Sequence, residues 1–218
     1  MKNRAASPPA PCLFVKRKDR RNTVLNWHRA PEEEFDIYAG VYWNAAQTLV
    51  KNLELDRIFG YDACPVVFLY RHALELFLKA ILLGDGANFL RNRPDPKWVM
   101  DHSHSLKELI PHVREILERF AREGEFGRNE VRTFDDFEAL VGELDNVDKN
   151  SCAFRYPVDK KLQGTVPGHF TFNAGNFARK MDDALNTLSG ACSMLPELWQ
   201  AECEAAYQAS NNADNVEG

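Results

Sequence analysis

Four polar side chains interrupt the apolar segment 65–83, and their residue types could support binding or acid–base chemistry. They are Arg71, His72, Glu75 and Lys79, and at about 100° per residue all four fall in one helical arc of about 100°. Arginine and lysine on one face can bind phosphate, whereas a carboxylate and an imidazole can transfer protons. The stripe has three interpretations: a solvated strip with an i,i+4 Glu75–Lys79 pair, a buried network tied to a neighbouring loop, or a ligand or phosphate site.

The same segment is long enough to cross a bilayer, but its charges argue against that role. Each charge at the centre of a membrane helix costs roughly 2.5–3.5 kcal/mol on insertion scales. The segment is therefore predicted to be a core helix of a cytoplasmic protein that has no membrane contact. The five cysteines are far apart and none forms a CxxC pair, which favours a reducing compartment.

The elements that would position this helix show helical periodicity. Apolar residues recur every three or four positions, and the pattern predicts helices over 31–55, 65–83, 105–120, 133–145 and 173–192. A last short helix is predicted from Pro196 to Tyr207. The sequence therefore predicts an all-α fold, an up-and-down bundle of about five helices with an irregular loop, residues 146–172, before the last long helix.

Cap signals and composition set the expected boundaries. Ser105 with Glu108 and Thr133 with Asp136 match capping boxes, and a hydrophobic staple is expected around the start of the helix at 173. The predicted organisation is a basic, partly disordered arm over 1–30, a helical bundle over 31–207 and a disordered tail over 208–218.

A second group of polar residues is expected to meet the stripe. Glu75 can accept the hydrogen bonds that an arginine donates. We therefore expect Arg155 or Tyr156, from the irregular loop, to pack near Glu75 and His104. His102 and His104 have the spacing of a loop metal site, but no cysteine or third histidine is suitably spaced, so neither a metal nor a cofactor is predicted. The candidate cluster, whether for binding or buried, comprises Arg71, His72, Glu75, Lys79, His104, Arg155 and Tyr156.

The first 31 residues differ in charge from the rest of the chain. They contain eight Lys or Arg residues and one acid, whereas the remaining residues have a net charge of −12. A basic arm on an acidic body can contact nucleic acid, but it can also fold onto its own domain or act as a solubilising tail. The candidate nucleic-acid contacts are Lys16, Arg17, Lys18, Arg20 and Arg21.

The apolar helix also resembles a known family. The run Arg71-His-Ala-Leu-Glu-Leu-Phe-Leu-Lys79-Ala-Ile-Leu-Leu is similar to the signature helix of HEPN-like proteins (higher eukaryotes and prokaryotes nucleotide-binding). In that family the Leu-Lys-Ala helix is followed by a His-x-Leu turn, which here is His104-Ser105-Leu106. The segment Ser151–Pro157 resembles a later turn of uncharacterised bacterial members. The similarity is good over 65–123 and looser to about 190, and it covers neither the arm nor the tail.

This resemblance implies a helical bundle that is often dimeric, in toxin–antitoxin, phage-defence or stress systems. Active members of the family are metal-independent ribonucleases. They carry an Arg-x(4–6)-His motif late in the bundle, at the dimer interface, where arginine holds the phosphate and histidine helps to move the 2′-hydroxyl proton.

The sequence departs from that catalytic pattern. His169 is the only histidine after His112, and the single pair with the required spacing, Arg21 and His28, lies in the arm, as chance predicts. The sequence therefore predicts a HEPN-like interaction or RNA/nucleotide-associated module that forms a homodimer and works with RNA, a nucleotide or a partner protein encoded nearby. The alternative is a metal-independent endoribonuclease that uses Arg71 and His72 with His104.

Overall fold

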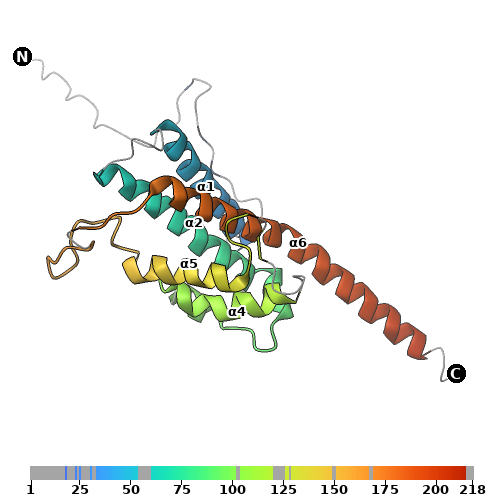
Figure 1. The fold of residues 1–218 in the computed structure, drawn as a ribbon. Helices are drawn as coiled ribbons and strands as arrows, with labels where there is room; N and C mark the ends of the chain where they lie inside the picture. The colour runs from blue at the N-terminus through green and yellow to red at the C-terminus, as the bar shows by residue number, and fades with distance from the viewer. Residues whose placement is uncertain are drawn as a thin grey trace, which may run out of the picture.

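The computed structural model describes residues 18, 23, 25, 30, 33–53, 60–101, 104–119, 126–127, 129–148, 151–166 and 169–214. Within these residues the regular elements are all helical, so the predicted all-α bundle is confirmed (Figure 1). The α-helices are α1 (Phe35–Asn52), α2 (Ala63–Leu83), α3 (Pro96–Asp101), α4 (Leu106–Glu118), α5 (Phe134–Val147) and α6 (Ala174–Asp214), with 3-10 turns η3 (Gly60–Asp62) and η4 (Asp85–Phe89).

Helix α2 is the central element of the bundle. It packs against α1, α4, α6 and η4, and α5 covers α4 on one side (Figure 1). Apolar side chains point from α2 in several directions, so most of its surface is buried, as is typical of a helix that is hydrophobic around most of its circumference. Its largest fully buried side chains include Tyr70, Arg71, Leu74 and Phe77. Any polar group on α2 must therefore find its partners inside the protein.

Two of the predicted helix starts form as expected. Thr133 and Asp136 form a reciprocal capping box at the start of α5. Asn173 accepts a hydrogen bond from the backbone N–H of Asn176 at 2.7 Å, and the rings of Phe172 and Phe177 meet edge to face at 5.8 Å. The cap and the staple at the start of α6 are therefore confirmed.

The predicted capping box at Ser105 is wrong. The Ser105 side chain makes no cap hydrogen bond at the start of α4. Its place is taken by Asp145 of α5, which accepts hydrogen bonds from the N–H groups of Leu106 at 3.4 Å and Lys107 at 3.0 Å. A charged acceptor from a neighbouring helix thus satisfies the orphan donors of the first turn.

The predicted break before Pro196 is also wrong, and α6 continues into the segment that was predicted as a tail. One helix runs through Pro196 to Asp214. Leu195 is buried and Trp199 packs edge to face on Phe89 at 5.6 Å, so the helix is held on both sides of the proline. This packing offsets the roughly 3 kcal/mol that an interior proline costs.

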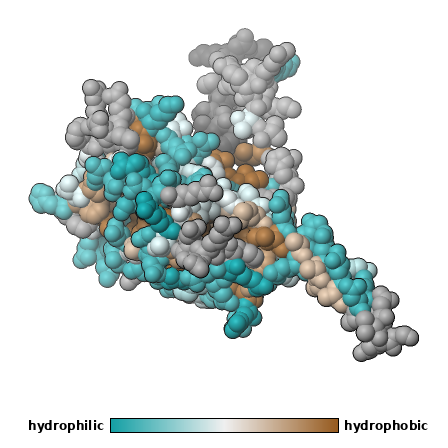
Figure 2. Space-filling model, turned by 45° about the vertical axis from the view of Figure 1, so that its right-hand side comes forward, coloured by the Kyte–Doolittle hydropathy of each residue, from teal (hydrophilic) through white to brown (hydrophobic). Residues whose placement is uncertain are grey.

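The end of α6 extends away from the bundle (Figures 1 and 2). Its last ion pair with the body joins Arg119 and Glu202 at 2.9 Å, and every described side chain from 203 to 212 is exposed. Within the described parts of the chain, no helix is both long and apolar enough to span a membrane. The predicted arm over 1–30 lies almost entirely outside the described residues.

Candidate functional site

Arg71 lies at the centre of a closed polar cluster in the core, with 0% of its surface exposed. Its Nη2 donates to the backbone carbonyl of His104 at 2.8 Å and contacts Asp145 Oδ1 at 3.4 Å. Its Nη1 donates to Glu75 Oε2 at 3.4 Å, and its Nε faces Asp148 Oδ2 at 3.5 Å. One guanidinium therefore joins three carboxylates, a role for which its planar set of donors is better suited than an ammonium group.

Asp148 connects this cluster to the irregular loop. Its Oδ1 accepts hydrogen bonds from the N–H groups of Cys152 at 2.7 Å and Ala153 at 2.8 Å. Its Oδ2 is turned toward Arg71, although neither that oxygen nor Arg71 Nε completes a hydrogen bond. Asp145 makes the equivalent connection to the start of α4. The cluster therefore fixes α4 and the loop relative to α2.

Glu75 and Lys79 complete the buried network. Lys79 Nζ donates to Glu75 Oε1 at 2.9 Å, and its side chain is only 6% exposed. The ammonium group also lies over the Phe35 ring, 5.9 Å from its centroid. His104 contributes mainly its carbonyl, because its side chain is 60% exposed and its Nδ1 lies 3.9 Å from Glu75. Of the three sequence interpretations, Arg71, Glu75 and Lys79 thus correspond to the buried network.

His72 points away from that network into a group of aromatic rings. It meets Tyr42 edge to face at 4.4 Å and stacks on Phe68 at 5.7 Å. Burial lowers the pKa of His72, although nearby Glu75 acts in the opposite direction. The imidazole is therefore favoured in its neutral form.

Arg155 does not form the expected pair with Glu75. Among the described residues no acid lies within ion-pair distance of its guanidinium, which instead lies over the rings of Phe68 at 5.3 Å and Tyr156 at 5.4 Å. Arg71, from the same helix as Glu75, takes the place that we expected Arg155 to fill. An i,i+4 partner on one helix is already in reach, whereas a loop residue would have to cross the edge of the bundle.

Asp145 and Asp148 are the members of the cluster that sequence reasoning missed. Both lie at the end of α5, where the negative end of the helix dipole disfavours acids. Two carboxylates three residues apart in that position indicate a nearby cation, and this signal could have identified them. The predicted arm contacts are not placed: Lys16, Arg17, Arg20 and Arg21 lie outside the described residues, and Lys18 is exposed.

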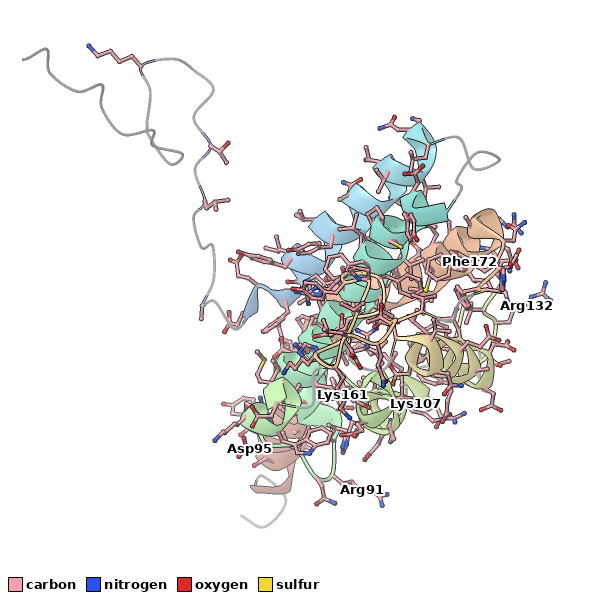
Figure 3. All side chains as sticks on the ribbon, turned by 90° about the vertical axis from the view of Figure 1, so that its left-hand side faces the viewer. Arg91, Asp95, Lys107, Arg132, Lys161 and Phe172 are labelled. Carbon is pink, nitrogen blue, oxygen red and sulfur yellow. The ribbon has the colours of Figure 1, made fainter. Side chains whose placement is uncertain are left out.

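A groove of about 650 Å³ opens beside the irregular loop. Its walls include Tyr61, which is 90% exposed, Tyr156, which is 52% exposed, and Phe170, which is 38% exposed. Exposed aromatic rings at this density are typical of binding surfaces. We call this region the hairpin surface, and define it as Tyr61, Arg155, Tyr156, Lys160, Lys161 and Phe170; Lys161 is labelled in Figure 3.

Hydrogen bonds within the loop connect the residues that flank Tyr156, Lys160 and Lys161. The N–H of Asp159 donates to the carbonyl of Gln163 at 2.8 Å, and Asp159 Oδ1 accepts the N–H groups of Lys161 and Gln163. Thr165 Oγ1 donates to the carbonyl of Ala153 at 3.2 Å. At the tip, Leu162 has a left-handed φ of 60° and is 82% exposed. The hairpin surface is therefore pre-organised, and the Arg71 cluster fixes its base through Asp148.

A second internal carboxylate joins three helices. Asp182 Oδ1 accepts hydrogen bonds from Trp43 Nε1 at 2.7 Å, Gln47 Nε2 at 3.0 Å and the Tyr70 hydroxyl at 2.9 Å. Burial, together with the charge of Asp182, raises the pKa of Tyr70 well above its usual range, so Tyr70 stays a neutral donor. This group holds α1, α2 and α6 together and is structural.

Comparisons with protein-family models, with curated proteins and with solved structures found no match for this chain. The HEPN-like family therefore stays a prediction that rests on residues 65–123. Within the described residues, no group of three or more His, Cys, Asp or Glu side chains has a metal-binding arrangement.

Proposed function

We propose that this chain is a HEPN-like helical binding module that associates with RNA and has no ribonuclease activity. The observation that carries the proposal is the state of Arg71, which is fully buried, paired with three carboxylates and hydrogen-bonded to a carbonyl. A phosphate could reach this guanidinium only if the core opened and left those carboxylates without their cation. Such a rearrangement is costly, because an uncompensated buried charge typically costs 3–5 kcal/mol, to order of magnitude.

The alternative ribonuclease set loses its phosphate-binding member for the same reason. His72 is half-buried among rings and His104 is exposed, and Arg71, which would stabilise the transition state, faces neither solvent nor a cleft. Metal-independent cleavage needs a cation at the phosphate together with a proton-transfer group. The buried network argues against that combination at α2.

The hairpin surface supports the association with RNA. Tyr61 and Tyr156 offer exposed rings on which bases can stack, and Arg155 has no acidic partner among the described residues. Lys160 and Lys161 add two exposed cations in the loop segment that follows Tyr156, in a chain whose overall charge is −5. Rings interleaved with cations are the usual composition of a surface that binds single-stranded nucleic acid.

The wider setting of the module follows from the resemblance. We propose that it works in the cytoplasm, in a bacterial defence, toxin–antitoxin or stress system. It would form a homodimer and act together with a different protein that is encoded nearby. A nucleotide is an alternative ligand of the same surface, because it carries the same phosphate and base chemistry. The basic arm adds cations that would strengthen RNA binding at low salt.

The test is a binding and cleavage assay with a short, fluorescently labelled single-stranded RNA at low and moderate salt. The wild-type protein is expected to bind the RNA, with affinity that falls as salt rises, and to leave it intact in the presence of a chelator. Tyr156→Ala and the double variant K160E/K161E are each expected to weaken binding roughly tenfold or more.

The matched control is the double variant R91E/K97E, which changes the net charge by the same amount at two exposed positions, one before α3 and one in it. It is expected to bind the RNA nearly as well as the wild type. Cleavage of the RNA by the purified protein, or no measurable binding at low salt, would contradict the proposal. Equal weakening by the two double variants would show that overall charge, rather than the hairpin surface, governs binding.

A further inference from the structure

One face of α1 exposes apolar side chains to solvent. Ile37 is 41% exposed, Tyr38 is 43% exposed and Val41 is 63% exposed, and Ala45 and Thr48 continue the same stripe. These residues follow helical spacing on the side of α1 opposite its buried positions, Ala39, Ala46 and Val50. A contiguous exposed apolar stripe on a helix marks a surface that is covered by a partner. We call it the α1 face.

The charges of α1 are confined to its two ends. Residues 37–50 contain no Asp, Glu, Lys, Arg or His. Glu33 precedes the helix and Lys51 lies in its last turn, and both are exposed. Glu33 lies just before the first turn and Lys51 lies in the last, so the two charges stand at opposite ends of the helix. The face is therefore acidic at one end, neutral in the middle and basic at the other.

The middle of α1 also allows another chain to come close. A Cβ atom added at Gly40 would meet no atom within 4 Å apart from its chain neighbours and the backbone of its own helix. A shallow groove beside the face is lined by Ala45, Leu49 and Leu69, from α1 and α2. Small residues and a groove permit one helix to pack against another with side chains interdigitated.

We propose that the α1 face is a two-fold interface between two copies of this chain, with the two α1 helices packed antiparallel. This inference rests on the homodimer in the proposed function and names its interface. A second copy is the occupant because the charge pattern complements itself: in the antiparallel arrangement Glu33 of each copy lies beside Lys51 of the other.

The same arrangement matches shape as well as charge. The point midway between Glu33 and Lys51 is Tyr42, so the two-fold axis passes close to Val41, the most exposed of the large apolar residues of the face. Tyr38 of each copy then lies opposite the groove at Ala45 and Leu69 of the other copy. Aromatic side chains that fill a partner's groove are typical anchors of a stable interface.

The experiment measures oligomeric state by sedimentation equilibrium across a range of concentrations. The wild type is expected to dimerise, and Val41→Glu is expected to weaken the dimer by roughly a hundredfold or more, because two carboxylates meet at the axis. The control is Met194→Glu, at a 53% exposed position on α6, which should leave the dimer intact. Circular dichroism should show unchanged helix content in both variants.

Charge exchange tests the antiparallel order. Glu33→Lys alone or Lys51→Glu alone places like charges together at both ends and should weaken the dimer roughly tenfold. The double variant E33K/K51E restores opposite charges and should recover most of the wild-type affinity. In addition, Val41→Cys should form an interchain disulfide under mild oxidation, whereas Lys51→Cys should not, because only residue 41 lies at the axis.

The outcomes separate this interface from the proposed function. If the dimer survives Val41→Glu, or if the double exchange does not restore it, the α1 interface is wrong. The homodimer would then form through another surface. A wild-type chain that stays monomeric overturns both the interface and the homodimer, and leaves the α1 face to a different protein. RNA binding by the K160E/K161E variant is measured separately and decides the hairpin surface alone.

Discussion

Arg71 Nε and Asp148 Oδ2 face each other at 3.5 Å inside the core, with 0% and 1% of the side chains exposed. This ion pair joins the most apolar helix of the fold to the loop that carries the hairpin surface. The attraction holds two charges that would otherwise be costly to bury. The buried cluster therefore positions the loop, whose exposed surface it does not belong to.

Replacing Arg71 by methionine removes the cation from this cluster. We expect Arg71→Met to lower the free energy of unfolding by about 3–5 kcal/mol, because the buried carboxylates lose their compensating charge. Urea denaturation measures the change, with Arg155→Met as the control. Replacing that exposed arginine should lower the free energy of unfolding by less than about 1 kcal/mol. Similar losses in the two variants would show that the buried network contributes little.

Two substitutions that affect the cap of α4 should differ in their cost to stability. The sequence predicts the larger loss for Ser105→Ala, whereas the structure predicts the larger loss for Asp145→Ala. Ser105→Ala should change stability by less than about 0.5 kcal/mol, because its side chain caps nothing. Asp145→Ala should cost about 2 kcal/mol or more, because it removes the cap of α4 and a partner of Arg71. Thermal or chemical denaturation of both variants compares the two losses. A larger loss in Ser105→Ala would contradict this account of the cap.

Asp183 should make stability depend on acid pH. Burial alone would raise its pKa, but hydrogen bonds from the Val131 N–H, the Asn129 amide and the Glu130 N–H lower it below the ordinary value. Because the pKa of Asp183 is lower in the folded than in the unfolded state, its carboxylate stabilises the fold above about pH 4. This stabilisation is lost as pH falls through the folded-state pKa. Asp183→Asn should therefore be less stable than the wild type at neutral pH.

The sign of this effect can be checked by denaturation at several pH values. The difference in the free energy of unfolding between wild type and Asp183→Asn should be largest near neutrality and should decrease below about pH 4. A gap that widens toward acid would mean that the carboxylate is destabilising in the fold. A constant gap would mean that the loss reflects packing, not charge.

Leu162 should be replaceable by glycine without loss of stability. A left-handed leucine costs roughly 1–2 kcal/mol, and this side chain, at 82% exposed, buries little in return. Glycine relieves that strain, although it also increases the entropy of the unfolded chain. Leu162→Gly should therefore be neutral or stabilising by up to about 1 kcal/mol in chemical denaturation. Leu162→Val, which keeps a branched side chain at the same φ, should be destabilising.

The helices were predictable where local chemistry decides them. Thr133 with Asp136 and the rings of Phe172 and Phe177 act within one turn, so their residue spacing was enough to place the starts of α5 and α6. The Ser105 cap failed because a distant acid, Asp145, provides a stronger acceptor. Local sequence patterns do not reveal a hydrogen-bond acceptor that another helix provides.

The site was predictable in its residue types and less so in its partners. The stripe on α2 correctly placed Arg71, Glu75 and Lys79 on one side of a helix, and the structure gathers them in one network. The other two acids of the network, Asp145 and Asp148, lie at the end of α5. Their contact with Arg71 depends on where the fold places α5 relative to α2. The exposed rings of the hairpin surface could not be recognised, because sequence does not state which aromatic residues stay outside a core.

The carboxylate of Asp182 has a consequence for how the chain is made. Its three donors belong to residues 43, 47 and 70, which leave the ribosome long before it does. Until the first turns of α6 are synthesised, the nascent α1–α2 pair lacks both this acceptor and one wall of its core. We therefore expect the emerging chain to depend on chaperones until α6 is complete, because contacts between distant residues must wait for the later one. Ribosomes stalled before residue 174 would hold a collapsed, protease-sensitive chain, whereas release after α6 would yield the folded bundle.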